Sequence, residues 1–113
     1  MTYVRNDPIV IYAGDYRPFT WPLTDTSGAP LVITGYTARA QVRASASDPI
    51  VLQEWSTTNG RAVLSTGSVS LLVDDSPGWT WTAGVYDLHL IDSAGRHEVI
   101  AYGPIRVQPG ITR

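Results

Sequence analysis

Hydrophobic and polar residues alternate with a period of two along three separate stretches of the chain. The stretches are residues 37–43, 68–73 and 85–91, and in each one apolar side chains fall on one face and mostly polar side chains on the other. The third stretch places Asp87 and His89 together on its polar face. Because successive side chains of a strand point to opposite sides of a sheet, each stretch predicts a half-buried β-strand.

Turn signals divide the rest of the chain into short segments. Clusters of Gly, Pro, Asp-Ser and Asn-Gly recur about every ten residues, and no helical pattern of apolar residues extends over three turns. A single helical turn is expected at 74–78, and further strands are expected at 8–12, 16–23, 50–55, 61–65 and 96–107. Seven to nine short strands joined by tight turns predict an all-β fold, an antiparallel two-sheet β-sandwich that is immunoglobulin-like in general shape.

Length, charge and composition narrow the class of protein. The 113 residues fit one domain, with segments 1–7 and 108–113 expected as extended arms outside the core. The absence of cysteine excludes disulfides and thiolate metal sites, and a net charge of −2 excludes the basic surface that binds nucleic acid. No apolar run approaches the ~20 residues that span a bilayer, and the first residues lack the apolar stretch of a signal peptide. We therefore expect neither membrane insertion nor export from the cytoplasm in which the protein is made.

Few residues are candidates for catalysis or metal binding. His89 shares a strand face with Asp87, and the following hairpin could bring His97 close to it. A metal or hydrolytic site needs a third convergent group, so we expect both histidines to be exposed residues of a polar face. The pair Asp74 and Asp75 offers the clustered oxygens that Ca²⁺ prefers, but its spacing matches no calcium loop and the Asp-Ser-Pro-Gly run is typical of a turn.

Motifs of the common enzyme classes are also missing from the sequence. It has no glycine-rich phosphate loop before a helix and no G-x-S-x-G motif for a serine nucleophile. We expect no enzymatic activity, no cofactor and no metal.

Two sets of side chains are candidates for binding surfaces. Trp79 and Trp81 fall on the same side of an extended segment, where two exposed indoles could stack on sugar rings or anchor a protein interface. The alternative is that at least one of them belongs to the core. Arg39 and Arg43 form a basic stripe on the outer face of their strand, either solvated or paired with carboxylates of a neighbouring subunit.

A set of turn and strand motifs extends along nearly the whole chain. It comprises Tyr-Ala-Gly-Asp at 12–15, Phe19, Trp21, Asp-Thr-Ser-Gly-Ala-Pro at 25–30, Ile-Thr-Gly-Tyr-Thr-Ala-Arg-Ala-Gln-Val-Arg at 33–43, Asn-Gly-Arg-Ala at 59–62, Gly-Ser-Val-Ser-Leu at 67–71, Ala-Gly-Val-Tyr-Asp-Leu-His-Leu at 83–90 and Val-Gln-Pro-Gly-Ile-Thr-Arg at 107–113. This set resembles small β-sandwich proteins of tailed bacteriophages and prophages. Its front half is also similar to the N-terminal domain of the upper baseplate proteins that hold receptor-binding proteins on siphophage tails. The chain departs from the family pattern at 74–81, where the family has a longer helical segment.

The resemblance implies a structural protein of a tailed-phage virion, located at the tail tip or baseplate. A capsid decoration protein on the head is the alternative, and a carbohydrate-binding adhesion module that uses Trp79 and Trp81 is another. The partners implied are other virion proteins, copies of this chain and, for the adhesion module, a host surface glycan. Candidate contact residues are Trp79, Trp81, Arg39, Arg43, Ile111, Thr112 and Arg113.

Overall fold

The computed structural model describes residues 5–109, and for Arg5 the backbone alone. Nine strands follow one another, and a short 3₁₀ helix, η1, is the only helical element of the described part. The strands are β1 (Arg5–Asn6), β2 (Ile9–Tyr12), β3 (Phe19–Pro22), β4 (Thr37–Arg43), β5 (Gln53–Ser56), β6 (Ala62–Ser65), β7 (Ser68–Leu71), β8 (Ala83–Ile91) and β9 (His97–Gln108), with η1 (Ser76–Gly78) between β7 and β8. No helix within residues 5–109 is long and apolar enough to cross a membrane.

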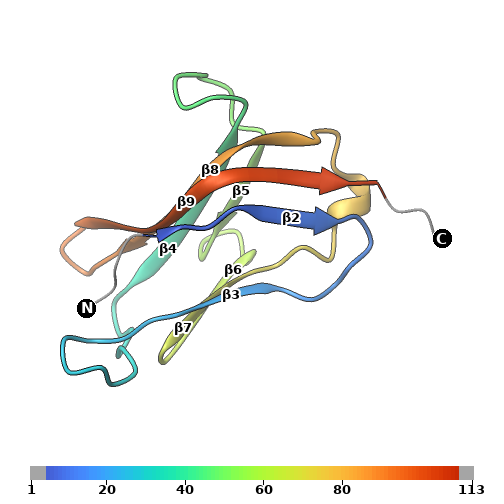
Figure 1. Cartoon of the computed structure of the whole chain (residues 1–113). Helices are drawn as coiled ribbons and strands as arrows, with labels where there is room; N and C mark the ends of the chain where they lie inside the picture. Colours follow the sequence, from blue (N-terminus) through green and yellow to red (C-terminus); the bar gives the residue numbers. More distant parts are fainter. Residues whose placement is uncertain (1–4, 110–113) are drawn as a thin grey trace.

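The strands form two sheets that pack face to face, as Figure 1 shows. The larger sheet has the order β1-β9-β8-β4-β5, with β2 also pairing with β9, and the smaller sheet has the order β3-β7-β6. In an immunoglobulin sandwich, strands B, E and D form one sheet and strands G, F, C and C′ form the other. The order here matches that arrangement, so the prediction of an immunoglobulin-like two-sheet sandwich is confirmed.

The first two strands depart from a purely antiparallel fold. β1 and β2 both run parallel to β9, with Arg5 opposite Ala101 and Ile9 opposite Ile105. β2 and β9 lie side by side in Figure 1. The larger sheet therefore extends into both segments expected as arms, 1–7 and 108–113. It includes β1 at residues 5–6, and β9 continues to Gln108. The candidate contact residues Ile111, Thr112 and Arg113 lie outside the described residues.

The core lies between the two sheets and consists of the apolar faces that the alternation predicts. All inward residues of the three alternating stretches are buried: Ala38, Ala40, Val42, Val69, Leu71, Val73, Tyr86, Leu88 and Leu90. Trp21 and Trp55 are buried with them. Removal of this apolar surface from water is the main force that holds the two sheets together.

Other expected elements differ in extent. The strand expected at 16–23 is confined to β3, since the loop that carries Pro18 precedes it. The expected helical turn is present as η1, but residues 79–82 form no strand and β8 begins only at Ala83. Within β8, Gly84 lies so close to β4 that an added Cβ would be 2.5 Å from the carbonyl oxygen of Arg43. Only glycine fits there without moving the backbone.

Candidate functional site

The outward side of the larger sheet carries polar side chains together with a few exposed apolar ones. We call this surface the outer face; it is formed on β4, β8 and β9 by Arg39, Gln41, Arg43, Val85, Asp87, His89, Tyr102 and Pro104. An open hollow of about 750 Å³ lies on it, lined in part by Arg43, Val85, Tyr102 and Pro104. A second hollow, of about 310 Å³, lies between the arginine stripe and the two histidines.

The sequence patterns did not identify Val85 or Tyr102 as residues of the outer face. Tyr102 is 43% exposed and Val85 is 37% exposed, and both line the larger hollow. Val85 shares a strand face with Asp87 and His89, so an apolar side chain on a polar face was the available signal. Tyr102 is paired with Asp87 across β8 and β9, which no local pattern reveals.

The predicted arginine stripe is present, but both arginines are hydrogen-bonded to neighbours in the larger sheet and in the loop after β4. Glu54 accepts hydrogen bonds from Gln41 Nε2 at 2.6 Å and from Arg39 at 3.2 Å. These two donors, Gln41 first, lower the pKa of the Glu54 carboxyl. Arg43 donates instead to the Gln41 side-chain oxygen at 3.0 Å and to the Asp48 carbonyl at 2.8 Å. Both acceptors of Arg43 are neutral, so these contacts leave its positive charge at the edge of both hollows.

The two histidines of the β8–β9 hairpin do approach each other, as the sequence suggested. The Nδ1 atoms of His89 and His97 are 3.0 Å apart, with the ring planes at 82°. On its other side, His89 Nε2 lies 3.1 Å from Asp87 Oδ2. His89 thus contacts a neighbour through each ring nitrogen. Within residues 5–109, no three His, Asp or Glu side chains are grouped so that they could hold a metal ion together.

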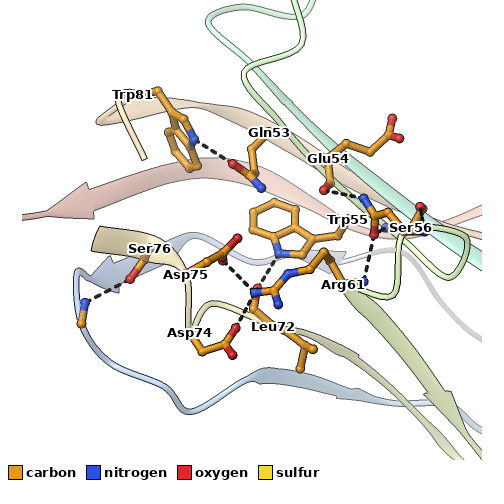
Figure 2. A network of polar contacts seen from close by, with 12 residues as sticks. Gln53, Glu54, Trp55, Ser56, Arg61, Leu72, Asp74, Asp75, Ser76 and Trp81 are labelled. Atoms are coloured by element: carbon orange, nitrogen blue, oxygen red, sulfur yellow. Dashed lines mark hydrogen bonds and ion pairs between the residues drawn. The ribbon is translucent and has the colours of Figure 1, made fainter. Parts of the chain in front are cut away.

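The tryptophans of the 79–81 segment pack inward. Trp79 and Trp81 stack with ring centroids 5.3 Å apart, and the rings of Trp55 and Trp79 meet at 79° with centroids 5.7 Å apart. Trp81 is only 8% exposed, and its Nε1 lies 3.4 Å from the Gln53 side-chain oxygen (Figure 2). Trp79 is half-buried against the same core. The core alternative is therefore correct for Trp81, and the segment offers no pair of open indole faces on which a sugar ring could stack.

The acidic pair considered for Ca²⁺ is occupied by a cation of the chain itself. Figure 2 shows the Arg61 guanidinium between Asp74 and Asp75, and its Nη2 donates to both carboxylates, to Asp75 at 2.7 Å. The hydrogen bond from Arg61 lowers the pKa of Asp74. The carbonyl of Leu72, 3.4 Å from Arg61 Nη2, also accepts the Nε1 proton of the buried Trp55 at 2.8 Å. This network holds the turn before η1 against the core, so a structural role accounts for both aspartates.

The chain is thus an immunoglobulin-like β-sandwich with an open hollow on the outer face of its larger sheet. No family model matches the chain, and no curated protein matches it. Among solved structures, it is similar to the extracellular domains 3–5 of Drosophila OTK, with 16% sequence identity and a TM-score of 0.36. The match covers 88% of this chain and 32% of that chain. A likeness of this size carries no argument about function.

Proposed function

We propose that this chain is a non-enzymatic structural protein of a tailed-phage virion, a minor component of the tail tip or baseplate that binds neighbouring proteins through its outer face. The phage role rests on the sequence resemblance, which covers the strand and turn motifs of nearly the whole chain. The choice of surface rests on the structure. The observation that carries it is the hollow of about 750 Å³ on the outer face, lined by exposed apolar side chains beside Arg43.

The composition of this hollow supports protein binding. Tyrosine and arginine are enriched in protein interfaces, because a large ring contributes apolar area and a guanidinium pairs with carboxylates. Tyr102 and Arg43 supply these two side chains beside the apolar Val85 and Pro104. The hydrogen bonds from Arg43 to Gln41 and Asp48 hold its guanidinium in place, so little side-chain entropy is lost when a partner binds.

Capsid decoration on the phage head is the alternative role, and it would use the same surface. A β-sandwich repeated by the symmetry of a particle gains avidity from a modest interface, whether on the head or on the tail. The adhesion role has less support, since Trp81 is buried and Trp79 is half-buried.

Mass spectrometry of purified particles, separated into heads and tails, tests the proposal. Recovery of this chain in the tail fraction supports a tail-tip or baseplate role. Recovery in the head fraction alone would replace it with capsid decoration. Absence from both fractions, in a host that expresses the chain, would overturn the virion role.

A further inference from the structure

We propose that His89 and His97 form a binding site for one divalent transition-metal ion of the class that prefers imidazole nitrogen, represented by Zn²⁺, and that Asp87 is its positioning residue. The sequence led us to expect no metal here, because it offered no third ligand. The described residues still group no third His, Asp or Glu ligand, but the two Nδ1 atoms lie 3.0 Å apart, so the proposed site has two protein ligands and takes its other ligands from water.

The separation of the two nitrogens suits one bound ion. Zn–N bonds are about 2.0–2.1 Å long, so two nitrogens on one zinc lie about 3.3 Å apart at a tetrahedral angle and about 2.9 Å apart at a right angle. The observed 3.0 Å lies between these values. In the metal-free protein the two nitrogens face each other and one of them carries the shared proton. Histidine χ2 is a soft torsion, and a rotation about it aims both lone pairs at a point beside the N–N line.

Asp87 prepares His89 for this role. Its Oδ2 lies 3.1 Å from Nε2 of His89, which places the imidazole proton on Nε2 and leaves Nδ1 as the acceptor of the Nδ1 proton of His97. Metal-binding histidines commonly donate their other ring N–H to a carboxylate, which fixes the tautomer and raises the basicity of the ligand nitrogen. His97 is exposed, so when the ion binds its Nδ1 the proton of that ring moves through solvent to its Nε2.

The surrounding charges set the affinity of the site for a divalent cation. Arg39 and Arg43 line the same hollow as the two histidines, and positive charge there opposes a cation. Arg39 is paired with Glu54 at 3.2 Å, and Asp87 contributes a negative charge beside His89. Arg43, whose hydrogen-bond acceptors at Gln41 and Asp48 are neutral, is therefore the side chain that weakens the site.

Two imidazoles select the metal by chemistry and leave the remaining coordination positions to water. Imidazole suits Zn²⁺, Ni²⁺ and Cu²⁺, whereas Mg²⁺ and Ca²⁺ prefer oxygen ligands. The site therefore binds the first group and not the second. It does not depend on the proposed role in a virion, since its ligands all come from one chain.

Isothermal titration of the full, metal-free chain with ZnCl₂ tests the proposal, with nitrogen NMR of the imidazoles as a second readout. We expect one Zn²⁺ per chain, a shift of both Nδ1 resonances, and no binding of Mg²⁺. His89→Ala and His97→Ala are expected to lower the zinc affinity at least tenfold, and Asp87→Asn to lower it by about 10–100-fold. Arg43→Gln is expected to raise it, and Asp25→Asn, a control carboxylate in the 25–30 turn that lines neither hollow, to leave it unchanged.

Two results would overturn the site. One is the absence of zinc binding at millimolar ZnCl₂. The other is zinc binding that survives unchanged in both histidine variants. Because the two histidines lie at the surface, far-ultraviolet circular dichroism of each variant is expected to match that of the parent chain.

Discussion

The indole Nε1 of Trp21 donates a hydrogen bond to the carboxylate of Asp7 at 2.7 Å. Trp21 belongs to β3 in the smaller sheet, and Asp7 lies between β1 and β2 at the edge of the larger one. The backbone carbonyl of Asp7 also accepts the Tyr86 hydroxyl proton at 2.5 Å, and its N–H donates to the Tyr102 carbonyl at 2.8 Å. One residue thus joins the two sheets and fastens the parallel edge strands to β9.

Asp7→Ala is expected to destabilise the fold through this contact. The substitution removes the acceptor of the Trp21 Nε1–H group, and Trp21 is only 4% exposed. An unsatisfied buried donor costs about 1–3 kcal/mol, so the free energy of unfolding in urea should fall by that amount. Asp7→Asn retains an oxygen acceptor and should lose less. Equal stability of Asp7→Ala and the parent chain would contradict the role of this hydrogen bond.

Gly84→Ala is expected to strain the contact between β8 and β4. The new methyl group meets the backbone of Arg43, which cannot rotate away, so overpacking should cost about 1–3 kcal/mol in the free energy of unfolding. Gly78→Ala is the matched control, because an added Cβ there has no heavy atom within 4 Å. Its thermal midpoint should stay within a few degrees of the parent value. A similar loss in both variants would show that the approach of β8 to β4 is not the cause.

Trp81→Ala tests the assignment of this indole to the core. Removal of a buried tryptophan costs about 3–5 kcal/mol, through lost burial and the cavity that remains. The neighbouring Thr80 is exposed, and Thr80→Ala should change stability by less than about 0.5 kcal/mol. Chemical denaturation of the two variants checks this assignment. If Trp81 were an exposed stacking platform, Trp81→Ala would keep the free energy of unfolding of the parent chain.

The pKa of Asp15 is expected to depend on Arg17. Hydrogen bonds from the Arg17 side chain and backbone lower the pKa of Asp15 from 3.8 to about 2. A lowered folded-state pKa adds stability that is present above about pH 4 and is lost as the pH falls towards 2. NMR titration of the carboxyl carbon should give the low value in the parent chain and a higher one, towards 3.8, in Arg17→Ala. An unchanged titration in the variant would exclude the Arg17 side chain as the cause.

The alternation of side chains predicted the core strands well, because β4, β7 and β8 each bury one face and expose the other. That pattern is local, so residues such as Ala38 and Leu88 could be assigned to the core without knowledge of their partners. The helical turn at η1 was equally local, since Asp-Ser-Pro-Gly favours a turn by itself.

Contacts between distant segments could not be predicted in this way. The parallel pairing of β1 and β2 with β9 joins the two ends of the described chain, and no period within either segment encodes it. Arg61, which directly precedes β6, forms ion pairs with both Asp74 and Asp75, whereas the acidic pair by itself suggested a cation site. The approach of His89 to His97 could be predicted because both lie close to the turn of one hairpin. The pairing of Tyr102 with Asp87 could not, because a bulge between Leu88 and His89 shifts the register of the same hairpin.

Photo-crosslinking from Tyr102 within assembled phage particles tests the binding role of the outer face most directly. A photoreactive phenylalanine analogue at position 102 is compared with the same analogue at Val63, which is 44% exposed on β6 of the smaller sheet, against 43% for Tyr102. We expect position 102 to form a crosslink to a second virion protein or to another copy of this chain, and position 63 to form none. Crosslinks from position 63 alone, or none from position 102 in particles that contain the chain, would contradict the proposed surface.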